Sequence, residues 1–314
     1  MAKLQSKLLR KQARSLLQTI PYRPKKLVLI HTGVSLGASL LLSILSYVLN
    51  LGIGQTGGLS GIGLRSVLAS AQAVLELGVS LVLPFWNVGL LFAALRWANG
   101  ENATPTHLLQ GFRRFPALLG LSFVQGGLYL VLGMAVFYIS SSLFLLTPYS
   151  DALMAQLAPL MEEGSADLLA AELMEAAGTS AIPLLALAAV LFAVVAIPMF
   201  YRLRFAPYAI MEGHGTVRSM VHSVRITKGS VLQLIKLDLS FWWFYLLQAL
   251  TVALCYGDQI LPALGITLPL SADLGFFLFY VLGIVTQLLL LWQCQARVST
   301  AYCLAYRMLE SQQF

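Results

Sequence analysis

Charged residues are scarce in this chain, and their scarcity excludes most soluble proteins. Only 11% of the 314 residues are Asp, Glu, Lys or Arg, whereas 58% are apolar and the mean hydropathy is +0.80. Because a soluble domain usually carries about 25% charged residues, so few charges would not cover the surface of a globular enzyme. The same apolarity excludes a disordered chain. Three cysteines without CxxC spacing exclude a disulfide scaffold and indicate packing residues. The composition therefore indicates a multi-pass membrane protein.

Long apolar runs divide the chain into membrane-crossing segments. A helix needs roughly 20 apolar residues to cross a bilayer core of about 30 Å. The segments that meet this condition are 27–49, 71–95, 117–146, 181–200, 231–254 and 274–296. Main-chain polar groups in lipid must be satisfied within the segment, and the alternation typical of barrel strands is missing. We therefore predict an all-α, polytopic bundle of six transmembrane helices.

Basic residues lie almost entirely on one side of these spans. Of the 20 Lys and Arg residues, all but Arg65 precede the first span, follow the last, or occupy the connections 96–114 and 202–236. By the positive-inside rule we expect both termini in the cytoplasm and the acidic loop 148–180 outside. The predicted organisation is a cytoplasmic helix in 1–26, a transmembrane domain in 27–296 and a cytoplasmic tail in 297–314.

The first twenty residues place leucines at helical spacing, with basic residues between them. The basic residues are Lys3, Lys7, Arg10, Lys11 and Arg14. This pattern favours an amphipathic helix that lies on the membrane and binds anionic lipids of the inner leaflet. A basic segment can also bind a cytosolic partner or nucleic acid. The apolar spacing disfavours that alternative, and we expect no nucleic-acid partner.

Two cytoplasmic connections are predicted to contain short amphipathic helices. Thr106 is expected to cap a turn that presents Leu108, Leu109 and Phe112. Thr216 is expected to cap a helix that ends near Gly229. The predicted apolar face of this second helix consists of Val217, Met220, Val221 and Val224.

The segment from Ile197 to Phe241 carries a resemblance to a known family. It contains Ile197-Pro198, Tyr201-Arg202, Ala206-Pro207-Tyr208-Ala209-Ile210, Thr227-Lys228-Gly229 and Leu237-Asp238-Leu239-Ser240-Phe241. These phrases, with the Gln110-Gly111-Phe112-Arg113-Arg114-Phe115 elbow, resemble a bacterial multi-pass family known as domain of unknown function nine-seventy-five. That family is similar to the membrane domain of some glycerophosphodiester phosphodiesterases. Met199, where the family is expected to have Gly, is a departure. The resemblance implies a six-helix bacterial plasma-membrane protein and brings no activity with it.

Polar residues within the spans are candidates for a functional site. Glu76, Gln125, Gln248 and Asp238 form the predicted intramembrane polar site. An acid such as Glu76 costs roughly 2.5–3.5 kcal/mol to place in a membrane and often has a function, although a position near the outer surface would let it reach water. Asp238 is expected to form a structural ion pair with Arg202 or Arg204. The alternative for Asp238 is a gate or substrate anchor.

Two strings match functional motifs in the wrong structural context. Gly33-Val34-Ser35-Leu36-Gly37 matches GxSxG, but inside a membrane helix its glycines are interpreted as packing residues. The GxGxxG match in 52–57 lies in a predicted external turn, 51–63, without a βαβ unit. We predict no catalytic residue, no metal and no cofactor.

Three classes of function remain open. We favour a non-enzymatic accessory or scaffold protein that binds a membrane partner. A transporter or channel for a small or amphipathic solute is the alternative, suggested by the interior glutamines, Glu76, and the helix breakers Pro84 and Pro198. An intramembrane enzyme would need reactive groups at one depth, which the sequence does not display.

Overall fold

The chain is mainly helical in the part that its computed structural model describes, residues 5–20, 23–55, 61–151, 155, 182–257, 260–261 and 272–312. None of these residues forms a strand, so the all-α prediction is confirmed for them. The helices are α1 (Ser6–Thr19), α2 (Pro24–Gln55), α3 (Gly61–Ala98), η1 (Pro105–Leu109), α4 (Gln110–Arg113), α5 (Phe115–Phe144), α8 (Ile182–Leu203), α9 (Ala206–Met211), α10 (Thr216–Ile226), α11 (Val231–Leu239), α12 (Trp242–Cys255) and α14 (Ala272–Ser311). Most of the predicted acidic loop 148–180 lies outside the described residues.

Among the described residues, five helical segments are long and apolar enough to cross a membrane. They are Pro24–Leu42, Ser66–Ala98, Phe115–Phe144, Pro183–Met211 and Leu274–Ser311, and the count becomes six if α11 and α12 together form one span. These segments correspond to the predicted spans. A multi-pass membrane protein is therefore the class that the helices support.

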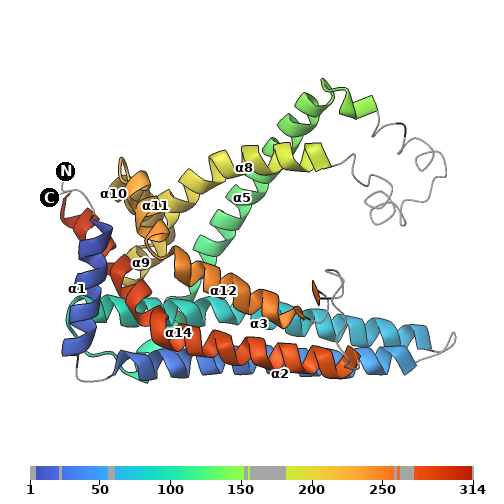
Figure 1. The fold of residues 1–314 in the computed structure, drawn as a ribbon, viewed down its shortest axis with the longest axis horizontal. Coiled ribbons are helices and arrows are strands. Elements are labelled where there is room, and N and C mark those ends of the chain that lie inside the picture. Colours follow the sequence, from blue (N-terminus) through green and yellow to red (C-terminus); the bar gives the residue numbers. More distant parts are fainter. Residues whose placement is uncertain are drawn as a thin grey trace. The chain divides into compact units, whose positions relative to one another are not determined.

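The chain divides into two compact units. The larger consists of residues 1–118 and 205–314, and the smaller of residues 119–204. In the larger unit, α14 packs against α2, α3 and α12, while α2 and α3 also contact each other. Figure 1 shows these four long helices side by side, with α1 crossing them near the end of α14. In the smaller unit, α5 and α8 approach each other where Gly133 lies opposite Phe192.

The contact between α2 and α3 is centred on an aromatic pair. The rings of His31 and Trp86 stack with their centroids 5.5 Å apart, and the Trp86 indole donates a hydrogen bond to the His31 carbonyl (3.0 Å). By contrast, a Cβ built on Gly33 or Gly37 would meet no atom within 4 Å. The predicted packing role of these glycines is therefore wrong within the described residues. The predicted turn 51–63 is also shorter than expected, because α2 continues to Gln55 and α3 begins at Gly61.

The fifth predicted span is broken rather than continuous. Helices α11 and α12 meet at an angle of 61° across Ser240 and Phe241. Phe241 has the non-helical angles φ −108° and ψ 16°, and its amide bonds to the Asp238 carbonyl (2.8 Å). Helix α12 has 14 residues, which at about 1.5 Å each cover about 21 Å. This is less than a bilayer core of about 30 Å, so α12 alone is too short to be a span.

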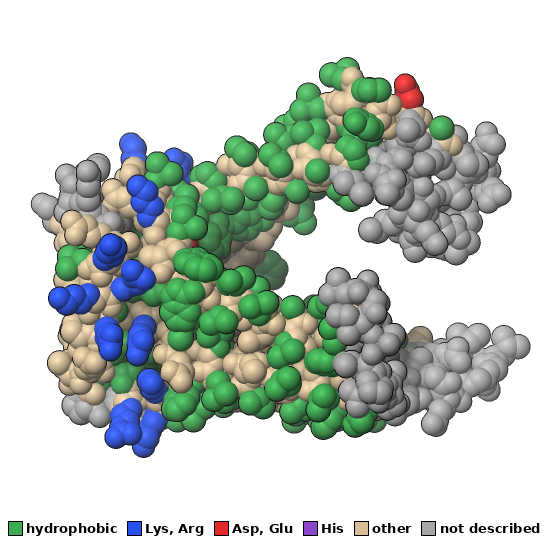
Figure 2. Space-filling view, viewed as in Figure 1, with side chains coloured by type: hydrophobic (Ala, Val, Ile, Leu, Met, Phe, Trp, Pro, Cys, Tyr) green, Lys and Arg blue, Asp and Glu red, His purple; other side chains and the backbone are tan. Residues whose placement is uncertain are grey.

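Helix α14 continues well past its apolar part. Its 40 residues extend about 60 Å. The predicted cytoplasmic tail after Ala296 is therefore helical as far as Ser311, as part of the same helix. Side chains in this continuation are buried against other helices of the larger unit, among them Ala301, Cys303 and Tyr306. We call α1, residues 93–113, residues 205–239 and residues 293–311 the basic layer. Figure 2 shows Lys and Arg side chains gathered over it.

The basic layer holds most of the fully buried large side chains among the described residues. They include Leu9, Trp97, Leu108, Phe205, Ile210, Leu234, Leu237 and Tyr306. The membrane-crossing helices instead present large apolar side chains outward, such as Leu41 and Phe123. This surface is what lipid contact requires.

The junction between α3 and the η1–α4 elbow depends on two glycines. A Cβ on Gly89 would collide with the main-chain carbonyl of Leu108, and one on Gly111 would collide with the carbonyl of Phe85. Two backbones thus approach each other at positions where only hydrogen fits. The close contact fixes the elbow against α3.

Both predicted elbow helices exist, but their caps differ from the predictions. Thr104, not Thr106, forms a capping box with His107 at the start of η1. Gly215 occupies the cap position of α10, and the Thr216 hydroxyl instead donates to the carbonyl of Ala117 (2.9 Å). Gly229 has the left-handed φ of +79° in the turn that follows α10, as its predicted role requires.

The predicted apolar face of α10 is exposed. Val217 and Val221, which belong to it, are 70% and 53% exposed. The buried residues are Ser219, Ser223 and Ile226. The Ser223 hydroxyl accepts a hydrogen bond from the buried main-chain amide of Phe205 (3.1 Å), which explains why a polar residue faces inward.

Candidate functional site: a polar cluster in the basic layer

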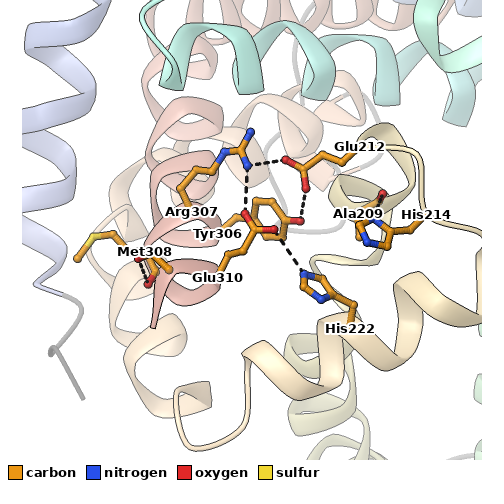
Figure 3. Close-up of polar contacts among 9 residues, drawn as sticks. Ala209, Glu212, His214, His222, Tyr306, Arg307, Met308 and Glu310 are labelled. Carbon is orange, nitrogen blue, oxygen red and sulfur yellow. Dashed lines mark hydrogen bonds and ion pairs between the residues drawn. The ribbon is translucent and has the colours of Figure 1, made fainter. Parts of the chain in front are cut away.

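Glu212 forms the centre of a polar cluster that joins α14 to the turn after α9 (Figure 3). The Tyr306 hydroxyl donates a hydrogen bond to Glu212 Oε2 (2.6 Å). Arg307 Nη1 lies 2.7 Å from Glu212 Oε1. Both carboxylate oxygens are thus occupied, one by a neutral donor and one by a cation. Such charge-assisted contacts are among the stronger polar interactions in proteins.

Arg307 extends the cluster to a second carboxylate. Its Nη1 also bonds to Glu310 Oε2 (3.0 Å), one helical turn further along α14. Glu310 Oε1 in turn lies 3.8 Å from His222 Nε2, which is an ion-pair distance rather than a hydrogen bond. The cluster therefore connects α14 to α10 as well as to α9.

Burial of His222 disfavours the charged form of its imidazole. Burial lowers the pKa of its imidazole below the ordinary value of 6.5, with Glu310 and Glu212 opposing this shift and His214 and Arg225 adding to it. The rings of His214 and His222 stack at 5.4 Å. His214 Nδ1 donates a hydrogen bond to the carbonyl of Ala209 (3.0 Å). This bond fixes the His214 ring, against which the His222 ring packs. Two adjacent rings disfavour a second positive charge.

Local geometry explains how the turn brings Glu212 to α14. Gly213 adopts φ +104°, a conformation that side chains rarely tolerate, and its amide bonds to the carbonyl of Ile210 (2.9 Å). The chain reverses there and places α10 beside α9, with which it is in contact. The rings of Phe205, Tyr208 and Tyr306 pack together with centroids about 5.3–5.5 Å apart. Because Tyr306 also bonds to Glu212, the polar cluster adjoins this aromatic cluster.

The chemistry available to this cluster is binding and positioning. Its carboxylates are paired with Arg307 and Tyr306, and Arg307 is shared between two carboxylates. Among the described residues, no group of three or more His, Cys, Asp or Glu side chains could hold a metal ion. The arrangement locks three helices together rather than leaving a charged group open for reaction.

The sequence offered little signal for this cluster. Tyr306 and Glu212 are 94 positions apart, and only the Arg307–Glu310 pair has a spacing that a helix brings together. That pair was the one local feature that could have indicated part of the network.

Two predicted polar-site residues of the larger unit, Glu76 and Asp238, have partners close to them in the chain. Glu76 accepts a hydrogen bond from Gln72 Nε2 (2.9 Å) on its own helix and is exposed on the protein surface. Asp238 Oδ1 accepts one from the Tyr245 hydroxyl (3.0 Å), beside the break between α11 and α12. Gln248 lies half-buried in α12, and Gln125 lies half-buried in α5 of the smaller unit. Glu76 and Asp238 thus have separate local partners.

The predicted ion pair of Asp238 with Arg202 or Arg204 would join the two units, and it stays a prediction. Arg204 lies at the end of the smaller unit, where its guanidinium is 5.7 Å from the Phe200 ring centroid and 5.6 Å from that of Tyr201. Asp238 belongs to the larger unit.

The N-terminal helix forms as predicted, but part of it packs on the protein. Leu9 and Ala13 are buried, and α1 contacts α14, α3 and α11. Arg10 donates to the carbonyl of Ser240 (2.9 Å), whereas Lys7, Lys11 and Arg14 are exposed. Lys3 lies outside the described residues. Of the residues predicted to bind lipid, Lys7, Lys11 and Arg14 therefore remain exposed on the surface.

In comparisons with family models, curated proteins and solved structures, no match to this chain was found. The resemblance stated from the sequence therefore stays a prediction, and the functional proposal below is based on the chain's own geometry.

Proposed function

We propose that this chain is a non-enzymatic scaffold of the bacterial plasma membrane, which binds a membrane partner at its basic layer. The positive-inside rule supports a basic layer that faces the cytoplasm, with both termini on that side. The resemblance to the uncharacterised bacterial multi-pass family agrees with this location.

The observation that carries the proposal is the internal pairing of Glu76, Asp238 and the Ser240 carbonyl. At the α11–α12 break, Arg10 donates a hydrogen bond to the carbonyl of Ser240, and the Tyr245 hydroxyl donates one to the carboxylate of Asp238. In α3, the Gln72 amide donates a hydrogen bond to the Glu76 carboxylate. A transport site would offer such carbonyls and carboxylates to a solute. Groups that already have partners support a structural role instead.

The surface for the partner is the exposed face of α10. Val217, Val221 and Val224 form an apolar row, and Arg218 and Arg225 are exposed on the same short helix. The buried Ser219–Ser223 side fixes the helix, so this face is presented on a rigid base. An apolar row beside two cations is complementary to an amphipathic helix with acidic side chains.

Site-specific photocrosslinking in cells tests this proposal. A photoreactive residue at Val221 should give one discrete protein adduct, and the same residue at Gln12, an exposed position on α1, should not. The recovered protein must then bind the intact chain in nanodiscs and lose that binding in Val221→Asp. Adducts to lipid alone, or equal binding by Val221→Asp, would contradict the proposed surface.

A transporter or channel is the second candidate, and one observation favours it. Helices α11 and α12 form a pair bent by 61°, and discontinuous helices often mark substrate sites in transporters. The Tyr245 and Tyr302 hydroxyls, 3.0 Å apart, add polar groups beside this bend. Water access to the helices distinguishes the two candidates.

A further inference from the structure

A pocket of about 480 Å³ lies between the end of α1, the start of α2 and α14. Four of its lining side chains are cationic: Arg14, Arg23, Lys25 and Arg297. The amides of Gln18 and Gln293 also line it, and no acidic residue is among the described lining residues. Three separate segments thus bring four positive charges to one cavity.

The cations that line this pocket have no acidic partner among the described residues. Within the described part of the chain, no carboxylate pairs with Arg14, Arg23 or Arg297. Lys25 is held 5.3 Å above the centroid of the Trp292 ring, a contact that orients its ammonium group without neutralising it. Repulsion among the cations would be relieved by a bound anion.

The pocket lies where the apolar helices meet the basic layer. Helix α2 begins at Pro24 and its apolar stretch starts at Leu27, whereas in α14 the apolar stretch ends near Trp292, shortly before Arg297. Tryptophan is enriched at this depth, where lipid headgroups meet the hydrocarbon core.

We infer that this pocket is a binding site for the phosphate-bearing headgroup of an anionic phospholipid. Arginine forks match phosphate oxygens, and basic pockets between transmembrane helices bind lipid headgroups of this kind. The volume is in the range of small-molecule sites, roughly 300–1,000 Å³. Its position at the membrane boundary favours a lipid phosphate over a soluble one. The inference does not depend on the scaffold proposal.

Native mass spectrometry of the intact protein, titrated with single lipids, tests this site. Phosphatidylglycerol should form a discrete adduct at concentrations where phosphatidylcholine forms none. The triple variant Arg14→Gln, Arg23→Gln, Arg297→Gln should bind phosphatidylglycerol about a hundredfold more weakly, because each basic residue near a membrane contributes roughly a factor of five. The charge-matched control Arg113→Gln, Lys228→Gln, Lys236→Gln removes three exposed cations outside the pocket and should bind like the wild type.

A second measurement keeps the test decisive if the triple variant does not fold. A photoreactive residue replacing Gln293 in the otherwise unaltered protein should crosslink phosphatidylglycerol in nanodiscs, and excess inorganic phosphate should not compete. Displacement by inorganic phosphate would overturn the lipid assignment in favour of a soluble anion. Equal loss of binding in the control variant would overturn the discrete site, since it would show attraction by net charge alone.

Discussion

Arg10 Nη1 donates a hydrogen bond to the main-chain carbonyl of Ser240, 2.9 Å away and 230 positions further along the chain. Its guanidinium also lies 5.9 Å from the centroid of the Phe241 ring. Carbonyls at the end of a helix lack helical partners and carry partial negative charge, so a cation is favourable there. The N-terminal helix thus stabilises the bend between α11 and α12.

Replacing Arg10 by Met should destabilise this bend. We expect a loss of about 2 kcal/mol in the free energy of unfolding, the usual worth of a hydrogen bond to a charged group. Hydrogen exchange in α11 and the first turn of α12 should accelerate. Lys11→Met removes an exposed charge from the same helix and should change neither quantity. Equal effects of the two variants would show that Arg10 acts through net charge.

Replacing Glu212 by Ala should destabilise the basic layer, because Tyr306 and Arg307 would both lose an acceptor. We expect a cost of about 2 kcal/mol, measured by chemical unfolding in detergent. Glu101→Ala is the matched control, because it breaks the more exposed Arg96–Glu101 pair, which is 3.1 Å long. Surface pairs contribute roughly 0–1 kcal/mol. A larger effect at Glu101 would contradict the central place of Glu212.

Acidification should weaken the packing of α10 through His222. Burial lowers the pKa of its imidazole in the folded state below 6.5. As the pH falls through 6.5, the unfolded chain takes up a proton that the folded chain resists, so stability falls until the pH drops below the folded pKa. Between about pH 8 and pH 5, the unfolding free energy of wild type should therefore fall more than that of His222→Gln. Parallel pH profiles would exclude His222 as the origin.

Two glycines of α3 should respond in opposite ways to alanine. Gly89→Ala would push a methyl group into the carbonyl of Leu108, with an expected loss of about 2 kcal/mol. Gly78→Ala has open space around it and should stabilise the same helix by roughly 0.5–1 kcal/mol. Thermal unfolding of the two variants measures the difference. A neutral Gly89→Ala would mean that η1 is not pressed against α3.

Features that depend on local sequence could be predicted, whereas those that depend on distant partners could not. Apolar length revealed the long helices, and leucine spacing revealed α1. The break at Ser240–Phe241 was missed because 231–254 reads as one apolar run, and its partner Arg10 is 230 positions away. The inward position of Ser223 in α10 could not be predicted, because it depends on the amide of Phe205, 18 positions away. The Glu212 cluster was missed because its partners Glu212 and Tyr306 are 94 positions apart in the chain.

Cysteine accessibility tests the scaffold proposal most directly. In a variant lacking Cys255, Cys294 and Cys303, single cysteines would be placed beside Glu76, Gln125, Gln248 and Asp238. A water-soluble maleimide would be applied to intact cells and to inside-out vesicles, with Asp151→Cys as the exposed reference. A scaffold with a dry interior predicts reaction at Asp151→Cys and none at the positions beside Gln125 and Gln248. Reaction at those two positions would reveal an aqueous pathway and would contradict the scaffold proposal in favour of transport.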